Sequence, residues 1–365
     1  MAKKYKILVL MKRFGTNKDM VLENFGRQVR LFESLKKYGY GIDFLCVDYT
    51  KKEHRNLKVK GIRYFVRPWH LLRPFYFLRE LDRLIRREKY DIIVAATEPL
   101  LGIVGHLFSI KYGKRFIYDL QDHYACYDSY RIPFVSAMDR KAVKKADLVI
   151  TVSETLKNEV KNIRKRTILT IPNGIDTRFL KRIGKQEARK RLGLPPKGKI
   201  IAYIGLIRGM KGARTMLDAF DRVRKEIPDA HLLLSGRVMD GIDINRKNVI
   251  FRALPVRKEV VQALYASDVA LIPNEDNLFS RYCFPYKVME YMACGLPIVA
   301  TRVGDLEQLL QEYRDSLCEP SNAADMAEKL VAQLRNKRKV NYSSQLRELS
   351  WSRLAVKIHR QIQVW

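Results

Sequence analysis

The chain has 365 residues, more than a single compact core usually holds, which indicates two domains of ordinary size. A hydrophobic content of 47% together with 30% charged residues excludes an intrinsically disordered protein. The 70 Lys and Arg outnumber the 39 Asp and Glu and give a net charge of +31, which favours an anionic partner such as nucleic acid, an acidic membrane or a phosphorylated substrate. A proteome rich in basic residues, or adaptation to heat, would produce the same excess.

The cysteines and the start of the chain predict a cytoplasmic protein. The five cysteines form no C-x-x-C pair, which is typical of reduced, buried thiols. The opening MAKKYKILVLMKRFG has too short an apolar run for a signal peptide and is predicted to be a first strand. The longest apolar stretch, 99–110, is interrupted by His106 and is shorter than the about 18 residues that a membrane span needs.

In the first half, short apolar runs alternate with helical patterns. The predicted strands are residues 6–11, 42–48, 91–96, 115–119, 148–152 and 167–171. The predicted helices include residues 25–38, 75–89 and 140–145. Near-continuous apolar strands that alternate with helices predict a parallel sheet covered by helices on both faces.

The sequence IPNG at 171–174 interrupts this alternation with strong turn chemistry, and a second series follows. Its predicted strands are 200–206, 231–235, 249–253, 269–273 and 297–301, and its predicted helices include 213–226, 260–266, 286–294 and 305–311. Two doubly wound, Rossmann-like α/β domains joined by a short hinge are the simplest architecture. Ligands bind such sheets beyond the carboxyl ends of the strands, so we expect the site in a cleft between the domains.

The first loop of the second half, YIGLIRGMKGARTMLDAF, carries Arg208 and Lys211 between a predicted strand and a helix that begins near Ala213. Two cations on a Gly-rich turn at a helix N-terminus suit a diphosphate. The guanidinium can bind it bidentately, the ammonium adds a point charge, and free backbone N–H groups help. A solvated basic turn in a basic protein is the alternative explanation.

A second segment, FPYKVMEYMACGLPIVAT, places Lys287 and Glu290 three residues apart on one helix face. A carboxylate there can accept the two hydroxyls of a ribose, while the lysine faces phosphate or sugar. An ordinary surface ion pair is the alternative, but it is less expected within so apolar a stretch.

Together, IPNGID, GLIRGMKG and FPYKVMEYMACGLPIVAT resemble the motifs of the family-4 retaining glycosyltransferases, which have the GT-B fold of two Rossmann-like domains facing across a cleft. The resemblance covers nearly all of the second half, whereas the first half matches in pattern only. It implies a hexosyltransferase that moves a sugar from a nucleotide-diphosphate-sugar donor to an acceptor hydroxyl with retention, without a metal or another cofactor. It assigns the donor diphosphate to Arg208 and Lys211 and the ribose hydroxyls to Glu290.

The resemblance also implies the domain organisation. The predicted parts are an N-terminal acceptor-side domain at 1–172, a donor-side domain at 173–345, and a terminal helix at 346–365 that crosses back to the first domain.

The sequence departs from the family pattern at Tyr282, eight residues before Glu290, where the E-x7-E motif has its first Glu. We interpret this as a variant branch; a catalytically dead, binding-only relative is the alternative. Backbone N–H groups near Cys283–Pro285 are the expected substitutes for the missing carboxylate. The donor site is therefore predicted to include Gly205, Tyr282, Phe284, Pro285 and Lys287 besides the residues named above.

In the first half, related enzymes place a Gly-rich loop near the donor phosphate, and the matching positions here are Gly26 and Arg27. The stretch YDLQDHYACYDSY follows a predicted strand and concentrates titratable groups. Asp122 and His123 are the candidates to orient the acceptor hydroxyl or to accept its proton. Arg27 as a surface charge, and an acidic residue as a helix cap, are the alternatives.

Residues 69–77, with Trp69, Phe75, Tyr76 and Phe77, lie among many arginines. This mixture predicts peripheral docking on an anionic membrane, at its inner face, to reach a lipid-linked or glycan acceptor. Three apolar residues further along are expected to pack on the sheet instead: Leu78, Leu81 and Leu84. The absence of a nucleic-acid-binding motif disfavours nucleic acid as the partner. A sugar-nucleotide epimerase or a phosphorylase on the same architecture stays open.

Overall fold

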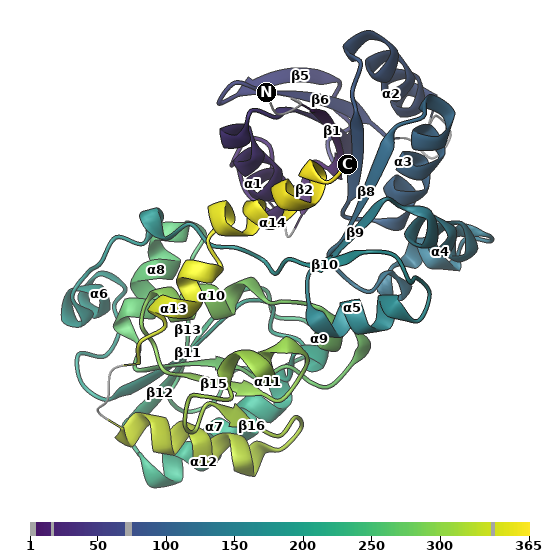
Figure 1. The fold of residues 1–365 in the computed structure, drawn as a ribbon. Coiled ribbons are helices and arrows are strands. Elements are labelled where there is room, and N and C mark those ends of the chain that lie inside the picture. Colours follow the sequence, from purple (N-terminus) through teal and green to yellow (C-terminus); the bar gives the residue numbers. More distant parts are fainter. Residues whose placement is uncertain (1–4, 16–17, 70–74, 337–339) are drawn as a thin grey trace. The chain divides into compact units, whose positions relative to one another are not determined.

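The computed structural model describes residues 5–15, 18–69, 75–336 and 340–365, and it divides into two compact units. The first unit comprises Met1–Gly174 with Ser350–Trp365, and the second comprises Ile175–Leu349. Each unit contains its own sheet with helices on both faces (Figure 1).

The sheet of the first unit has eight strands in the order β10-β9-β8-β7-β1-β4-β6-β5. Every neighbouring pair is parallel except β5 and β6, which form an antiparallel hairpin at one edge. The strands are β1 (Lys6–Lys12), β4 (Gly41–Asp48), β5 (Arg55–Val59), β6 (Ile62–Pro68), β7 (Ile92–Ala96), β8 (Arg115–Leu120), β9 (Leu148–Thr151) and β10 (Ile168–Thr170). The central strands β1 and β7 are almost wholly buried because helices cover both faces.

The helices of the first unit separate onto the two faces of its sheet. They are α1 (Arg27–Glu33), α2 (Phe75–Glu88), α3 (Pro99–Tyr112), α4 (Val135–Lys145), α5 (Glu154–Lys161) and α14 (Trp351–Gln363), together with the 3-10 turns Ser34–Tyr38, Tyr124–Cys126 and Asp128–Arg131. Figure 1 shows α2, α3 and α4 on one face and α1 and α14 on the other. The terminal helix α14 packs on α1 and the turn after it, where the His359 ring stacks on Tyr38 with centroids 4.1 Å apart.

The sheet of the second unit has six parallel strands in the order β13-β12-β11-β14-β15-β16. They are β11 (Lys199–Ile204), β12 (Ala230–Ser235), β13 (Val249–Phe251), β14 (Val269–Ile272), β15 (Ile298–Thr301) and β16 (Leu317–Cys318). The helices are α6 (Lys185–Arg191), α7 (Ala213–Glu226), α8 (Arg257–Ala266), α9 (Leu278–Tyr282), α10 (Tyr286–Ala293), α11 (Asp305–Leu310), α12 (Ala323–Arg335) and α13 (Ser343–Glu348). Apolar side chains of α7 and α12 pack against β11, β12 and β14 to form its main core.

The prediction of two doubly wound, mostly parallel sheets is confirmed. The helix predicted at 140–145 begins earlier, at Val135, and the helix predicted at 25–38 is α-helical only over Arg27–Glu33 before a 3-10 turn. The hairpin of β5 and β6 was not predicted. The edge strand β5 has no apolar run, and all of its residues are exposed or partly exposed. Across the described residues, no helix combines the length and the apolar character that a membrane span requires.

Candidate functional site

Three glycines bring loops of the second unit close together at the carboxyl ends of its strands. Gly205, Gly212 and Gly236 all have positive φ angles. A Cβ atom on Gly212 would lie 1.6 Å from the carbonyl oxygen of Pro273, just after β14, and one on Gly236 would lie 2.0 Å from the oxygen of Gly205. Only glycine fits such approaches. The loops after β11, β12 and β14 therefore converge at one edge of the sheet, where the topology places ligands.

Arg208 and the turn that follows it hold a carboxylate. The Arg208 Nε lies 3.1 Å from Asp240 Oδ2, and the same oxygen accepts the N–H of Gly209 at 3.0 Å. Asp240 comes from the loop after β12, 32 residues along the chain. Both side chains are more than one third exposed, so this ion pair contributes little to stability. The predicted diphosphate residue Arg208 thus already binds one anionic group together with a backbone N–H.

Lys211 and Lys287 bring two ammonium groups into the same region. Lys287 Nζ lies 4.0 Å from the ring centroid of Tyr203, and a Cβ atom on Gly205 would lie 2.9 Å from that nitrogen. Lys211 Nζ lies 3.9 Å from the ring centroid of Phe279. Burial, and after it the positive charge of Lys211, lower the pKa of Lys287 to about 7, while Cys283 and Glu290 oppose the shift. Two cations whose charges interact in a partly dry site favour an anion beside them.

Glu290 on α10 pairs with Arg257, the first residue of α8. Its Oε1 accepts from Arg257 Nη2 at 3.3 Å, and both side chains are partly exposed. A long, half-exposed ion pair is worth about 0–1 kcal/mol, so a ribose can compete with Arg257 for the carboxylate. Arg257 was not predicted from the sequence, because the helix there was expected to begin three residues later and nothing local ties it to Glu290.

The segment before α10 offers fewer backbone donors than the sequence suggested. Tyr282 ends α9 and is partly exposed, whereas Phe284 is buried. The N–H of Cys283 donates to the carbonyl of Phe279 at 3.1 Å, and Pro285 has no N–H to give. Within the segment predicted to substitute for the missing carboxylate, the N–H of Cys283 is thus engaged inside the protein and Pro285 offers no donor.

In the first unit, the Arg27 side chain binds groups of the protein itself. Its guanidinium is buried and pairs with the carboxylate of Asp119 at 2.8 Å. It also donates to the carbonyl of Pro172 at 3.0 Å and to that of Ile171. Gly26 has a φ of 95° at the start of α1, which explains glycine at this position without a ligand. Arg27 thus joins the end of β8 to the segment at 171–172.

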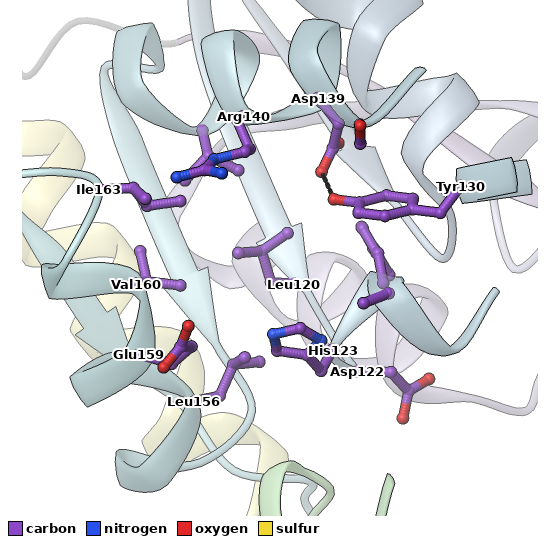
Figure 2. Close-up of a pocket in the computed structure, with 14 residues that line it drawn as sticks. Leu120, Asp122, His123, Tyr130, Asp139, Arg140, Leu156, Glu159, Val160 and Ile163 are labelled. Atoms are coloured by element: carbon purple, nitrogen blue, oxygen red, sulfur yellow. Dashed lines mark hydrogen bonds between the residues drawn. The ribbon is translucent and has the colours of Figure 1, made fainter. Parts of the chain in front are cut away.

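Asp122 and His123 follow β8 beside a cavity of about 300 Å³ that α4 and α5 also line. Figure 2 shows the His123 ring beside Leu120 and Leu156, while Asp122 is directed away from it. Asp122 accepts the hydroxyl of Tyr127 at 2.8 Å. Burial lowers the pKa of His123, which favours the neutral ring that a proton acceptor requires. Although the two residues are adjacent in sequence, the His123 ring lies among apolar side chains of the cavity and Asp122 binds the Tyr127 hydroxyl.

The cavity also contains a buried carboxylate that sequence reasoning missed. Asp139 on α4 accepts the hydroxyls of Tyr118 and Tyr130, the second of which is drawn in Figure 2. Burial raises the pKa of Asp139 to about 6, although both hydroxyls oppose the shift. Among the described residues, no group of three or more His, Cys, Asp or Glu is arranged to hold a metal ion.

Solved structures match this architecture over its whole length. The Anabaena protein HepE, solved in complex with UDP, superposes with a TM-score of 0.76 at 18% identity and covers 99% of this chain and 100% of its own. The chain has the GT-B fold. At this level of identity the likeness to HepE shows the fold alone.

Two family models match the GT-B chain, each over most of one unit. Residues 29–179 match the family described as Glycosyltransferase Family 4, and residues 198–336 match the family described as Glycosyl transferases group 1. An N-acetyl-alpha-D-glucosaminyl L-malate synthase of Bacillus anthracis is 28% identical over 216 residues, which are 56% of this chain and 54% of that protein. The chain thus spans about half the length of that relative.

An uncharacterized glycosyltransferase of Methanocaldococcus jannaschii is 26% identical over 77% of both chains. Together with the fold, these matches support a GT-B glycosyltransferase of the family 4 type.

Proposed function

We propose that the protein transfers a sugar from a nucleoside-diphosphate sugar to an acceptor hydroxyl. One observation carries the proposal: Lys211 and Lys287 lie close enough for one charge to depress the pKa of the other, at the edge of the sheet where Arg208 already holds a carboxylate. A diphosphate at this edge carries negative charge that all three cationic side chains attract. HepE, which has the same fold, has been solved with UDP and with UDP-glucose, and this supports a nucleotide-sugar ligand.

The proposed chemistry follows from where charge develops. As the bond between sugar and diphosphate breaks, negative charge grows on the leaving oxygen, and Arg208, Lys211 and Lys287 stabilise it. Glu290 takes the ribose hydroxyls in exchange for its ion pair with Arg257. No metal is required in this scheme, because three cationic side chains supply the positive charge.

Retention of the anomeric configuration and transfer of a hexose are further parts of the proposal, and they rest on the resemblance of the donor motifs. The leaving diphosphate then removes the acceptor proton, and His123 or Asp122 orients the acceptor. The acceptor is a glycan or a lipid-linked sugar. The anomeric configuration of the isolated product, read from its proton coupling constants, tests retention; an inverted product contradicts it.

Calorimetric titration with UDP, GDP, ADP and CMP tests the donor site directly. We expect one nucleoside diphosphate to bind and Lys211→Ala to weaken it by about tenfold to a hundredfold, the usual loss for a charged hydrogen bond. Arg222→Ala, an exposed basic residue on α7, is the matched control and should bind as the unaltered protein does. If no nucleotide binds, or if Lys211→Ala binds as tightly, this site is not the donor site. A product assay then separates sugar transfer from epimerisation and phosphorolysis.

A further inference from the structure

On helices α2, α3 and α4 the basic side chains are exposed and the acidic side chains are buried or partly covered. Together they carry nine Arg and Lys and four Asp and Glu, which leaves a net charge of +5. All nine basic side chains are exposed, whereas none of the four acidic ones is. Glu80 and Asp139 are buried, and Asp82 and Glu88 are partly covered. On the outer surface of these helices, which we call the α2–α4 face, the exposed charged side chains are therefore all basic.

The same face exposes large apolar side chains. Six of them belong to these helices or to the residue before one: Phe75, Tyr76, Leu107, Ile110, Phe134 and Met138. Phe134 is 80% exposed and Phe75 is 73% exposed, values far above those of a side chain that packs on its own unit. Isolated exposed apolar residues are common, but a group rimmed by one sign of charge marks an interaction site.

Helical spacing places the two kinds of side chain on common stripes. Along α4, Phe134, Met138, Lys141 and Lys145 follow each other at intervals of four, three and four residues, which is one face of a helix. Along α2, Phe75 is followed by Arg79 and Arg83 at intervals of four.

The three helices are also neighbours. Asp82 of α2 accepts from Lys111 and from Tyr112 at the end of α3. α3 packs against α4, and Lys141 and Lys145 of α4 lie close enough to His106 of α3 to help burial lower the pKa of that ring. Figure 1 shows the helices on one face of the sheet of the first unit. The stripes thus form one continuous surface.

We propose that the α2–α4 face docks the protein on an anionic lipid bilayer. Arginine and lysine side chains attract the phosphates of acidic lipids, and bulky apolar side chains between them enter the boundary between headgroups and acyl chains. The complementarity favours a bilayer over nucleic acid, because a nucleic acid offers phosphates but gives exposed Phe134 and Ile110 no apolar phase. A second copy of the chain presents the same positive face and is repelled.

This proposal revises the membrane segment expected from the sequence. Within 69–77, the Phe77 side chain is fully buried and packs against Trp69, with ring centroids 5.8 Å apart, so neither residue is a lipid anchor. Residues 70–74 lie outside the described residues. The anchors are instead Phe75 and Tyr76 of that segment, joined by the exposed apolar side chains of α3 and α4.

Helices of the second unit provide the contrast. The outer surface of α7 exposes Asp218 and Glu226 as well as Arg222 and Lys225, and no large apolar side chain of α7 is exposed. The α2–α4 face combines exposed basic side chains with exposed apolar ones, whereas α7 offers a bilayer neither a surface without exposed acids nor an apolar group.

Flotation with lipid vesicles tests the proposal on the full chain. We expect binding to vesicles of phosphatidylglycerol and phosphatidylcholine, little binding to phosphatidylcholine alone, and weaker binding at 1 M than at 0.1 M salt, where the screening length falls from about 10 Å to about 3 Å. Reversal of three charges by Arg79→Glu, Lys141→Glu and Lys145→Glu should weaken binding at least about 100-fold, since each basic residue near an anionic surface contributes about fivefold. Phe134→Ser with Met138→Ser should weaken it at any salt concentration.

The control reverses three exposed charges of the second unit, Lys190→Glu, Arg222→Glu and Lys225→Glu, and should bind vesicles almost as the unaltered protein does. Equal loss in the control would show a non-specific effect of net charge and overturn the proposal, as would absence of binding to anionic vesicles at 0.1 M salt. Preference for RNA over vesicles, or self-association that the face variants abolish, would also overturn it. Nucleotide titration of the same variants keeps the two proposals apart, because docking does not depend on the donor site.

Discussion

The depressed pKa of Lys287 makes donor binding depend on pH in a way that can be measured. In the protein without ligand, burial and the charge of Lys211 set this pKa at about 7. A diphosphate beside the ammonium stabilises its charged form and raises the pKa toward its ordinary value. Binding above pH 7 must therefore take up a proton, and it should weaken as the pH rises.

The size of this effect follows from linkage. Between pH 7 and the higher pKa of the complex, the dissociation constant should rise by up to about tenfold for each pH unit, and below pH 7 it should be flat. From pH 6.5 to pH 9 the expected loss of affinity is thus about 100-fold. At pH 8, about 0.9 proton should be taken up for each ligand bound.

Isothermal titration of an intact nucleotide sugar, in two buffers with different ionisation enthalpies, measures both quantities. A nucleotide sugar is preferred because its diphosphate carries no group of its own that titrates near neutrality. Lys287→Met should bind weakly, with no proton uptake and no pH dependence in this range. In Lys211→Met the loss of the neighbouring charge should move the onset of the pH dependence upward. An affinity that is flat from pH 6.5 to 9, without proton uptake, would refute the reasoning.

Three further predictions follow from other contacts. Because folding lowers the pKa of Lys287, its positive charge destabilises the folded state below pH 7, and this cost disappears as the pH rises toward 10.5. Lys287→Met should therefore raise the melting temperature at pH 6. A lower melting temperature would contradict the assignment. Arg27→Met leaves the buried Asp119 carboxylate without its partner and should cost about 3–5 kcal/mol of unfolding free energy in urea titrations, whereas the exposed Arg79→Met should change it little. Arg257→Ala should leave the nucleotide affinity within about fivefold or tighten it, because the substitution removes a competitor for Glu290. Glu290→Gln should weaken nucleotide binding. A large loss of affinity in Arg257→Ala would show that Arg257 itself binds the ligand.

The sequence determined much of this protein by local pattern. Apolar runs alternating with helical segments are enough to specify two parallel sheets, since strands buried on both faces can arise in few other ways. The same reading located the loop that contains Arg208 and Lys211 between β11 and α7, and helical spacing put Lys287 and Glu290 on one helix. These are relations between residues a few positions apart, which propensity and periodicity encode directly.

Only the tertiary structure decided what those side chains meet. Asp240 reaches Arg208 across 32 residues, Arg257 reaches Glu290 across 33, and Asp119 reaches Arg27 across 92, and no local pattern encodes such pairs. The sequence suggested Arg27 for the donor phosphate, and packing shows its guanidinium occupied by a buried carboxylate. The pKa of Lys287 and the exposure of Phe134 likewise depend on how much of the surrounding chain excludes water. That is a property of the folded structure and not of the adjacent residues in the sequence.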